Sequence, residues 1–418
     1  MAQLSDDCFA HGGRLMTTAE ALERLTGRVS RVTEDEPVAL AEGLGRILAE
    51  DLVAPADVPP HDNSAVDGYA VYFDDLDPAA ETRLPVVGRA AAGHPLAGPA
   101  ERGAAVRIFT GALMPAGPDT VMMQEDCRVE DGQVVIAPGI RRGANRRVHG
   151  EDIRAGARVL AKGQRLRAQD LGQAAAVGRT ALQVSRPLKV ALFSTGDELR
   201  EPGAPLEPGC IYDSNRVTVS ALLQGLGCRV SDLGILEDRA EVIRAALAAA
   251  AGDHELIVTT GGVSVGEEDH VKQAVDALGA IHFWRLAIKP GRPIALGQVA
   301  RVPIVGLPGN PVAVVVTFVN LVRPLILSLM GGTDLLPHHF RVRAAFDHKK
   351  KKNRREWVRA RLEADAEGGW QAIKFPRDGA GILSSLVESD GLVELPEEMT
   401  YLKRGTLVDF LPFSEVCA

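Results

Sequence analysis

The pattern of apolar and polar positions changes several times along this chain. Between residues 189 and 335, apolar runs at 190–193, 255–260 and 304–307 predict buried strands, and a further strand is expected over 229–236. Amphipathic segments separate them, and strands that alternate with helices are typical of a mostly parallel sheet covered on both faces. We expect the helices at 214–226, 240–251 and 269–278, and further strands of the same sheet at 281–288 and 293–296.

Two other regions carry short apolar runs separated by Gly, Pro and Asp. This pattern is typical of compact β domains. We therefore expect an inserted β domain within residues 61–150 and a small C-terminal β-barrel or sandwich after Pro337. The expected strands are 68–72, 84–88, 105–108, 120–124 and 133–136 in the first, and 341–345, 356–362, 370–375, 392–395 and 406–410 in the second.

The remaining segments favour helices. A helix with a threonine cap should begin near Thr18, a second helix is expected over 39–49, and residues 151–180 again have helical composition. Proline residues after Ala54 mark a boundary. Residues 312–330 are almost wholly apolar, but Asn320, Arg323 and Pro324 interrupt the run. A charge at the middle of a bilayer is costly, so we expect a buried core helix there and no membrane span.

Composition excludes several classes of protein. The 418 residues are 46% apolar and 24% charged, which is typical of folded globular domains, and the length suggests about three of them. The net charge of −8 and the 4% aromatic content argue against nucleic-acid binding. The five cysteines form no CxxC pair, and residues 1–14 lack the apolar stretch of a secretory signal. We therefore expect a cytoplasmic protein.

One strongly basic segment covers residues 348–355. It could be a localisation signal or a patch that binds polyanions. We favour a simpler interpretation, in which the segment is a solvated hairpin turn between two strands.

Three loops follow predicted strands of the α/β unit. In open α/β sheets, ligands bind where such loops meet at the carboxyl ends of the strands. Glycines there let backbone N–H groups approach an anion, and a serine hydroxyl adds a donor. The pattern predicts a site for a phosphate-bearing ligand. The candidate residues are Thr195, Gly196 and Glu198 in the first loop, Gly261, Gly262, Ser264 and Gly266 in the second, and Pro308, Gly309, Asn310 and Pro311 in the third.

Cationic residues form a second set. Arg285 and Lys289 are four positions apart, so they would share a face of a strand, and Arg292 follows a turn. Such charges suit an oxyanion or a phosphate. Pairing with surface carboxylates is the alternative.

Acidic residues form a third set at the boundaries of the predicted domains. Asp67 lies at the start of the inserted β domain, Asp152 at its end, and Asp238 and Asp269 near helix starts in the α/β unit. An aspartate in a first helical turn is often only a cap. Beside a phosphate ligand, however, carboxylates imply a divalent cation, and magnesium is held in this way.

Gly262, Ser264 and Gly266 also match the GxSxG elbow of serine hydrolases. The acidic residues that follow, Glu267, Glu268 and Asp269, argue against this alternative, because an oxyanion hole needs donors.

Taken together, the ordered motifs resemble the molybdopterin molybdotransferase family (MoeA-type, related to the gephyrin E domain). The resemblance covers nearly the whole chain. It depends on residues 62–70, 107–112, 150–153, 194–199, 260–266, 289–293 and 306–311.

The resemblance implies a multidomain α/β and β architecture. Residues 1–13 would be a flexible extension, and 14–54 with 154–185 an elongated domain I. Residues 55–153 would be the inserted β domain II, 186–335 the molybdopterin-binding α/β domain III, and 336–418 the C-terminal β-barrel domain IV. The family members are homodimers, with a cleft between the α/β domain of one subunit and the inserted domain of the other.

The resemblance also implies an activity. Family members insert molybdate into adenylated molybdopterin, which releases AMP and molybdenum cofactor, with a divalent cation such as Mg²⁺. Transient contact with the adenylyltransferase and with recipient molybdoenzymes would follow. Positions that match functional residues of the family are Asp67, Thr110, Asp152, Glu198, Asp238, Asp269, Lys289, Pro308, Pro311 and Arg359, with Asp238 and Asp269 on the metal.

Two features depart from the family pattern. Arg285 and Arg292 stand where many members have lysine, and Ala380 stands where relatives often have serine. Ser384 or Ser385 could replace the missing hydroxyl. A scaffold that keeps the fold for partner binding is the remaining alternative, although the retained acidic residues and Lys289 argue against a purely structural role.

Overall fold

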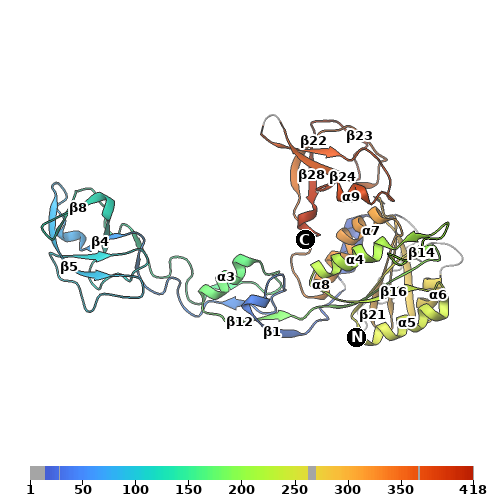
Figure 1. Ribbon diagram of the computed structural model, residues 1–418, viewed down its shortest axis with the longest axis horizontal. Helices are drawn as coiled ribbons and strands as arrows, with labels where there is room; N and C mark the ends of the chain where they lie inside the picture. The colour runs from blue at the N-terminus through green and yellow to red at the C-terminus, as the bar shows by residue number, and fades with distance from the viewer. Residues whose placement is uncertain (1–14, 28, 262–269, 366–367, 418) are drawn as a thin grey trace.

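The computed structural model describes residues 15–27, 29–261, 270–365 and 368–417, and only the backbone of residues 282–284. The extension predicted over residues 1–13 lies outside this part. The molecule is elongated, with a β domain at one end and the α/β and C-terminal β domains together at the other (Figure 1). A narrow segment around β1, β12 and α3 joins the two ends. The domain boundaries predicted above stay predictions.

The first helix confirms the predicted threonine cap. Helix α2 (Thr18–Thr26) begins after Thr17, whose hydroxyl accepts a hydrogen bond from the Glu20 backbone N–H, while the Glu20 carboxylate accepts one from the Thr17 N–H. This reciprocal pair is a capping box.

The prediction of a helix over residues 39–49 is wrong. Strand β1 (Asp35–Ala39) pairs with β12 (Ala181–Ser185), and only a single 3₁₀ turn, Leu40–Glu42, follows it. Gly45 then takes φ +74°, a left-handed conformation that ends any helical path. Periodicity cannot reveal a strand whose partner, β12, lies more than 140 residues further along the chain. The rest of the narrow segment contains β2 (Leu52–Val53), β11 (Arg158–Leu160) and α3 (Ala168–Ala176).

The inserted β domain is a six-stranded sheet in the order β7-β4-β6-β5-β9-β8. All five strands predicted here are present, and apolar side chains pack on both faces of the sheet. The strands are β4 (Gly68–Val71), β5 (Thr82–Ala90), β6 (Ala105–Ile108), β7 (Thr120–Met123), β8 (Cys127–Glu130) and β9 (Gln133–Ile136), with β3 (Asn63–Ser64) and β10 (Arg146–Arg147) forming a separate ribbon.

The α/β domain contains a six-stranded sheet in the order β16-β13-β17-β21-β20-β18. Strands β16 (Arg229–Leu236), β13 (Lys189–Thr195), β17 (Leu256–Thr260) and β21 (Val302–Leu307) are parallel, as predicted. Strand β20 (Pro293–Val299) runs antiparallel to β21, because the turn between them is too short for a crossover. Strand β18 (Gly279–Arg285) lies at the edge of the sheet and is antiparallel to β20. The helices are α4 (Ser214–Gly225), α5 (Ala240–Asp253) and α6 (His270–Asp276), and short strands occur at β14 (Leu199–Arg200), β15 (Ile211–Tyr212) and β19 (Ile288–Lys289).

The apolar segment forms a buried helical rod, as predicted. Helix α7 (Pro311–Thr317), a π turn (Phe318–Val322) and α8 (Arg323–Leu329) follow one another without a break. Within the described chain, Pro311–Leu329 alone is long and apolar enough to span a membrane, but 89% of its apolar window is buried inside the protein. The rod is therefore the centre of the largest hydrophobic core.

The C-terminal domain is a closed five-stranded barrel. Strands β24, β25, β22, β28 and β26 are neighbours in this order, and β26 pairs back onto β24. Their bounds are Arg355–Ala364, Trp370–Lys374, Phe340–Ala344, Leu407–Pro412 and Gly391–Leu395, and the shorter elements are β23 (His348–Lys349), α9 (Ser384–Val387) and β27 (Tyr401–Leu402).

The prediction of a solvated hairpin turn over residues 348–355 is confirmed only in part: Lys352 and Asn353 form an exposed turn, but the segment is not a hairpin. The strands on either side of the segment, β22 and β24, are not neighbours in the barrel. Moreover, two residues of the segment point inward: His348 and Lys350 are buried, and the Lys350 ammonium donates to the carbonyl oxygens of Pro396 and Met399 at 2.7 Å each. Those carbonyls compensate the charge, a contact that residue order does not reveal.

Candidate active site

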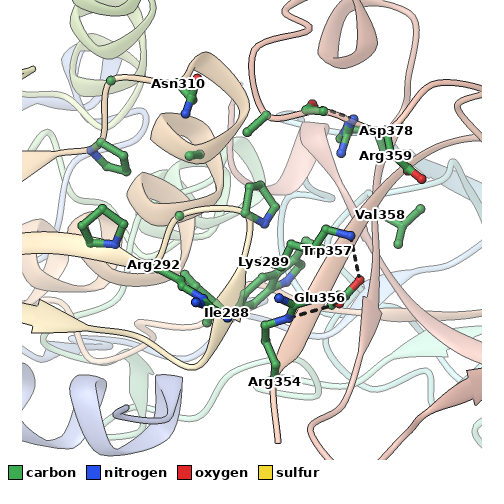
Figure 2. A pocket seen from close by; sticks show the side chains of 18 of the residues that line it. Ile288, Lys289, Arg292, Asn310, Arg354, Glu356, Trp357, Val358, Arg359 and Asp378 are labelled. Atoms are coloured by element: carbon green, nitrogen blue, oxygen red, sulfur yellow. Dashed lines mark hydrogen bonds and ion pairs between the residues drawn. The ribbon is translucent and has the colours of Figure 1, made fainter. Parts of the chain in front are cut away.

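A cleft of about 590 Å³ lies between the α/β domain and the barrel. Its lining comes from the loops after β17 and β21, from the turn after β19, and from barrel residues on β24 and in the loop 378–380. Figure 2 shows Lys289, Arg292 and Asn310 from the α/β domain facing Arg359 and Asp378 from the barrel. Eight of the residues predicted from the sequence line this cleft: Glu198, Gly261, Lys289, Arg292, Pro308, Gly309, Asn310 and Arg359.

The parallel strands explain why the three predicted loops meet. Strands β13, β17 and β21 are neighbours, and Ser194, Thr260 and Leu307 lie side by side at their carboxyl ends. A smaller pocket of about 70 Å³ adjoins the cleft at this edge and contains Thr195 and Pro311. The two pockets share Glu198, Gly261 and Gly309, so the described residues of the three loops border one continuous recess.

The glycines of this recess have different structural roles. Gly261 has φ +83°, and a Cβ placed there would lie 2.5 Å from the Thr195 carbonyl oxygen, so the turn itself requires glycine. Gly309 has no such conflict: a Cβ there would meet no heavy atom within 4 Å. Gly309 therefore leaves its backbone open towards the recess, which suits the close approach of a ligand.

Asp238 and Thr195 come together at the same sheet edge. The Thr195 hydroxyl is buried and donates to Asp238 Oδ1 at 3.2 Å. Gly196 follows in a turn where a Cβ would lie 2.6 Å from Glu198 Oε2. Asp238 is half-buried and, in the described part of the chain, lines neither pocket.

Lys289 and Arg285 do not share the face of one strand. Strand β18 ends at Arg285, and β19 joins the barrel sheet through parallel pairing of Ile288 and Lys289 with β24. Gly291 in the following turn has φ +98°, and a Cβ there would meet Thr317 Oγ1 at 2.5 Å. The chain thus leaves one sheet and enters another between the two cations. Arg285 is exposed and is not among the described residues that line the cleft.

Glu356 is the central residue that sequence reasoning missed. It is 2% exposed, and its Oε2 lies 3.4 Å from Lys289 Nζ and 3.1 Å from His348 Nε2, while Arg354 donates to Oε1 at 3.2 Å. Burial alone would raise the pKa of Glu356, but hydrogen bonds from His348 and Arg354 and the charge of Lys289 hold that pKa at about 2. The basic segment, read only as a turn, gave no signal of this cluster.

Arg359 forms the barrel wall of the cleft. Its Nε donates to Ser385 Oγ at 3.0 Å and its Nη2 to the Gly379 carbonyl at 3.0 Å, and burial lowers its pKa. Ser385 is fully buried and in turn donates to the Ile382 carbonyl at 2.6 Å. Ser385 therefore supports Arg359 and does not replace the hydroxyl missing at Ala380, which lines the cleft. Ser384 is exposed.

Asp67 and Thr110 form a local pair in the inserted domain. Asp67 Oδ1 accepts hydrogen bonds from the Thr110 backbone N–H and hydroxyl, both at 2.7 Å, and these bonds lower its pKa. Asp152 is exposed in a loop of the same domain. The domain lies at the opposite end of the molecule from the α/β domain and the barrel (Figure 1), so these three residues do not reach the cleft of their own chain.

Comparison with known proteins identifies the family. Three family models match in order: the MoeA N-terminal region (domain I and II) over residues 16–178, a probable molybdopterin binding domain over 191–328, and the MoeA C-terminal region (domain IV) over 341–413. The molybdopterin molybdenumtransferase of Haemophilus influenzae is 38% identical over 404 residues, with 96% of this chain and all of that protein covered. The chain belongs to the MoeA family of molybdopterin molybdenumtransferases.

Other MoeA relatives agree. The molybdopterin molybdenumtransferase of Nostoc is 34% identical over 93% of this chain and 91% of its own. A solved structure of a molybdopterin biosynthesis moeA protein from Pyrococcus horikoshii has a TM-score of 0.81 at 29% identity and covers 96% of this chain and 100% of that one. The fold and the barrel expected from the resemblance are therefore those of this family.

The metal site expected in a MoeA protein is described only in part. Asp269, Gly262, Ser264 and Gly266 lie outside the described residues, so their predicted roles stay predictions. Within the described residues, no group of three or more His, Cys, Asp and Glu side chains is placed to hold a metal ion. Asp238 is available at the sheet edge, where one carboxylate together with ligand phosphate is a donor set that suits magnesium.

Proposed function

We propose that this protein catalyses the final step of molybdenum cofactor biosynthesis, in which molybdate is inserted into adenylated molybdopterin and AMP is released. The observation that carries the proposal is the cleft, where cationic side chains from two domains face the glycine-rich edge of the α/β sheet. The protein is then a transferase that acts on small molecules.

The charges of the cleft suit the substrates. Molybdate is a dianion, and the adenylated pterin carries phosphate groups. Lys289, Arg292 and Arg359 line the cleft and present ammonium and guanidinium groups, which bind oxyanions through charge-assisted hydrogen bonds. We assign molybdate to Lys289 and Arg292 with Arg359. The pterin and its phosphates belong at the recess around Gly261, Gly309 and Asn310, together with Thr195, Gly196, Pro308 and Pro311.

Carboxylates have a different task in this proposal. Asp238 and Asp269 would hold Mg²⁺, which when bound neutralises the phosphates and polarises the bond to AMP. Glu198 lines both pockets, so its carboxylate faces the recess that would hold the substrate. Thr195 fixes the orientation of Asp238 through its 3.2 Å hydrogen bond.

The proposal includes a homodimer. Asp67, Thr110 and Asp152 cannot act in the cleft of their own chain, because their domain lies at the other end of the molecule. A two-fold related copy would bring them to the cleft of the partner subunit. We place the protein in the cytoplasm, in transient contact with the adenylyltransferase that supplies its substrate and with the molybdoenzymes that receive its product.

One reconstitution tests the activity. Purified protein is incubated with adenylated molybdopterin, Mg²⁺ and molybdate, while AMP release and activation of a cofactor-free molybdoenzyme are measured. Both signals should require molybdate and should be lost in Asp238→Ala. If Asp238→Ala retains full activity, the assignment of the metal side is wrong. Absence of AMP release from the unaltered protein would contradict the proposed function itself.

A further inference from the structure

We propose that Glu356 is a positioning residue that fixes the Lys289 ammonium in the cleft, and that His348 and Arg354 hold Glu356 in place. The inference deepens the proposed function and rests on it, since Lys289 is assigned there to molybdate. It gives the barrel a specific task, because all three supporting residues come from the barrel while the lysine comes from the α/β domain.

The backbone already places the two residues side by side. Strand β19 pairs in parallel with β24, and Lys289 is the register partner of Glu356. Lys289 Nζ lies 3.4 Å from Glu356 Oε2, and Figure 2 shows Glu356 between Lys289 and Arg354. The Lys289 side chain is 47% exposed towards the cleft, whereas that of Glu356 is 2% exposed. The carboxylate therefore anchors a partly free ammonium from behind.

His348 continues the chain of contacts behind Glu356. Its Nε2 lies 3.1 Å from Glu356 Oε2 and its Nδ1 lies 3.4 Å from Lys374 Nζ, and Lys374 also pairs with Asp378 at 3.0 Å. An ammonium can only donate, so Nδ1 is the acceptor and Nε2 carries the hydrogen that Glu356 accepts. A relay thus runs from Asp378, on the wall of the cleft, through Lys374 and His348 to Glu356.

The charges of this cluster favour positioning over stability alone. Lys289 and Arg354 carry two positive charges against the one negative charge of Glu356, which leaves a net positive charge facing the cleft. Burying a carboxylate is costly, and an apolar residue often serves stability equally well. A buried carboxylate that contacts the lysine can instead hold the Lys289 ammonium in one position in the cleft.

The test compares two barrel carboxylates. Glu394 on β26 is also part of a Glu/His/Arg cluster, since it pairs with His339 at 3.3 Å and with Arg355 at 2.8 Å, but it does not line the cleft. Glu356→Gln should raise the molybdate concentration for half-maximal AMP release about tenfold or more, while Glu394→Gln should change it less than about twofold. Equal effects of the two substitutions would overturn the proposal.

A second readout does not need catalysis. Trace acylation with acetic anhydride, followed by peptide mapping, measures how fast Lys289 reacts at a fixed pH. The hydrogen bond to Glu356 at 3.4 Å holds the Lys289 side chain against the barrel, so loss of that contact should make Lys289 react several-fold faster in Glu356→Gln but not in Glu394→Gln. An unchanged rate in Glu356→Gln would contradict the pairing. If the unaltered protein releases no AMP, the proposed function fails, whereas the acylation result still decides the pairing.

Substitutions of His348 test whether its hydrogen bond holds Glu356 in place. They also test the proposal if Glu356→Gln does not fold. Glutamine places an amide N–H near the position of the histidine Nε2, so His348→Gln should retain most molybdate affinity. His348→Leu removes the donor and should reproduce the Glu356→Gln phenotype, with a loss in molybdate affinity that exceeds any loss in kcat. If leucine and glutamine behave alike at this position, His348 does not act through its hydrogen bond.

Discussion

The cleft and the Asp67–Thr110 pair are built in opposite ways. The cleft is lined by cations from two domains, and its lysine depends on a carboxylate that is almost fully buried. Asp67 is held by two hydrogen bonds from one residue of its own domain, at the other end of the molecule. One region presents positive charge and the other negative charge. Among the residues that the structure describes, neither region contains the full set of groups that an anionic substrate and its counter-ion require.

This difference suggests which perturbations should matter where. In the cleft, a substitution acts on partners from another domain, so long-range effects are expected. At Asp67 the hydrogen bonds are local and lower the pKa of the carboxyl, so the group stays ionised at neutral pH whatever happens in the barrel. A substitution in one region should therefore leave the structure of the other region intact. In a dimer, the intact cleft of one chain could then work with the intact Asp67 of the other.

The largest effect is expected for Lys289→Ala. Loss of a positioned donor to a developing or bound oxyanion typically costs about 100-fold to 1,000-fold, and the loss should fall on molybdate use more than on pterin binding. Titrations of both ligands measure the split. Arg285→Ala is the comparator, because Arg285 lies outside the described cleft lining and should cost a few-fold at most. Equal losses of molybdate and pterin binding would refute the assignment of Lys289.

Mixing two inactive chains tests whether the regions act together across subunits. Lys289→Ala and Asp67→Ala should each be nearly inactive alone. In a mixed dimer, one of the two clefts combines an unaltered Lys289 with an unaltered Asp67 from the partner subunit, so co-refolded chains should recover about a quarter of the original AMP release. Co-refolding Lys289→Ala with Asp238→Ala is the control, since both positions lie in the same domain. Recovery in that control as well would exclude a cleft shared in the proposed way.

Acid sensitivity should distinguish the buried cluster from exposed carboxylates. The pKa of Glu356 is about 2, below its usual 4.5, so its contribution to stability is complete above about pH 4.5 and is lost as the pH falls towards 2. Relative to the original chain, Glu356→Gln should lose roughly 3 kcal/mol of unfolding free energy at pH 7 and progressively less below pH 4.5. Urea unfolding at several pH values measures this. Exposed Glu388→Gln should show no such trend, and a pH-independent loss in Glu356→Gln would contradict the ion-pair account.

Local patterns predicted much of this molecule, and the failures share one cause. The parallel strands, the apolar rod and the three loops at the sheet edge follow from periodicity and from the rule that parallel strands end at one edge. The false helix over 39–49, the basic segment and Glu356 depend on partners far away in the sequence. The prediction that Arg285 and Lys289 share one face of a strand was wrong for the same reason, because the chain leaves the α/β sheet after Arg285 and Lys289 pairs with the barrel strand β24. Most cationic and loop residues of the cleft could thus be predicted, but not the carboxylate that pairs with Lys289.

The smallest effect should come from Ala380→Ser, which tests how complete the barrel side of the cleft is. Ala380 lines the cleft, and its carbonyl accepts a hydrogen bond from the Val312 N–H at 2.9 Å, so the backbone there is already fixed and a serine would only add a hydroxyl. One neutral hydrogen bond contributes about 1 kcal/mol, which corresponds to about a fivefold lower molybdate concentration for half-maximal AMP release. Ala380→Cys has a similar size but a poor donor, and should leave that concentration unchanged. If cysteine and serine give the same result, size and not hydrogen bonding matters at this position; if serine has no effect, Arg359 and Lys289 already satisfy the oxyanion without the barrel loop.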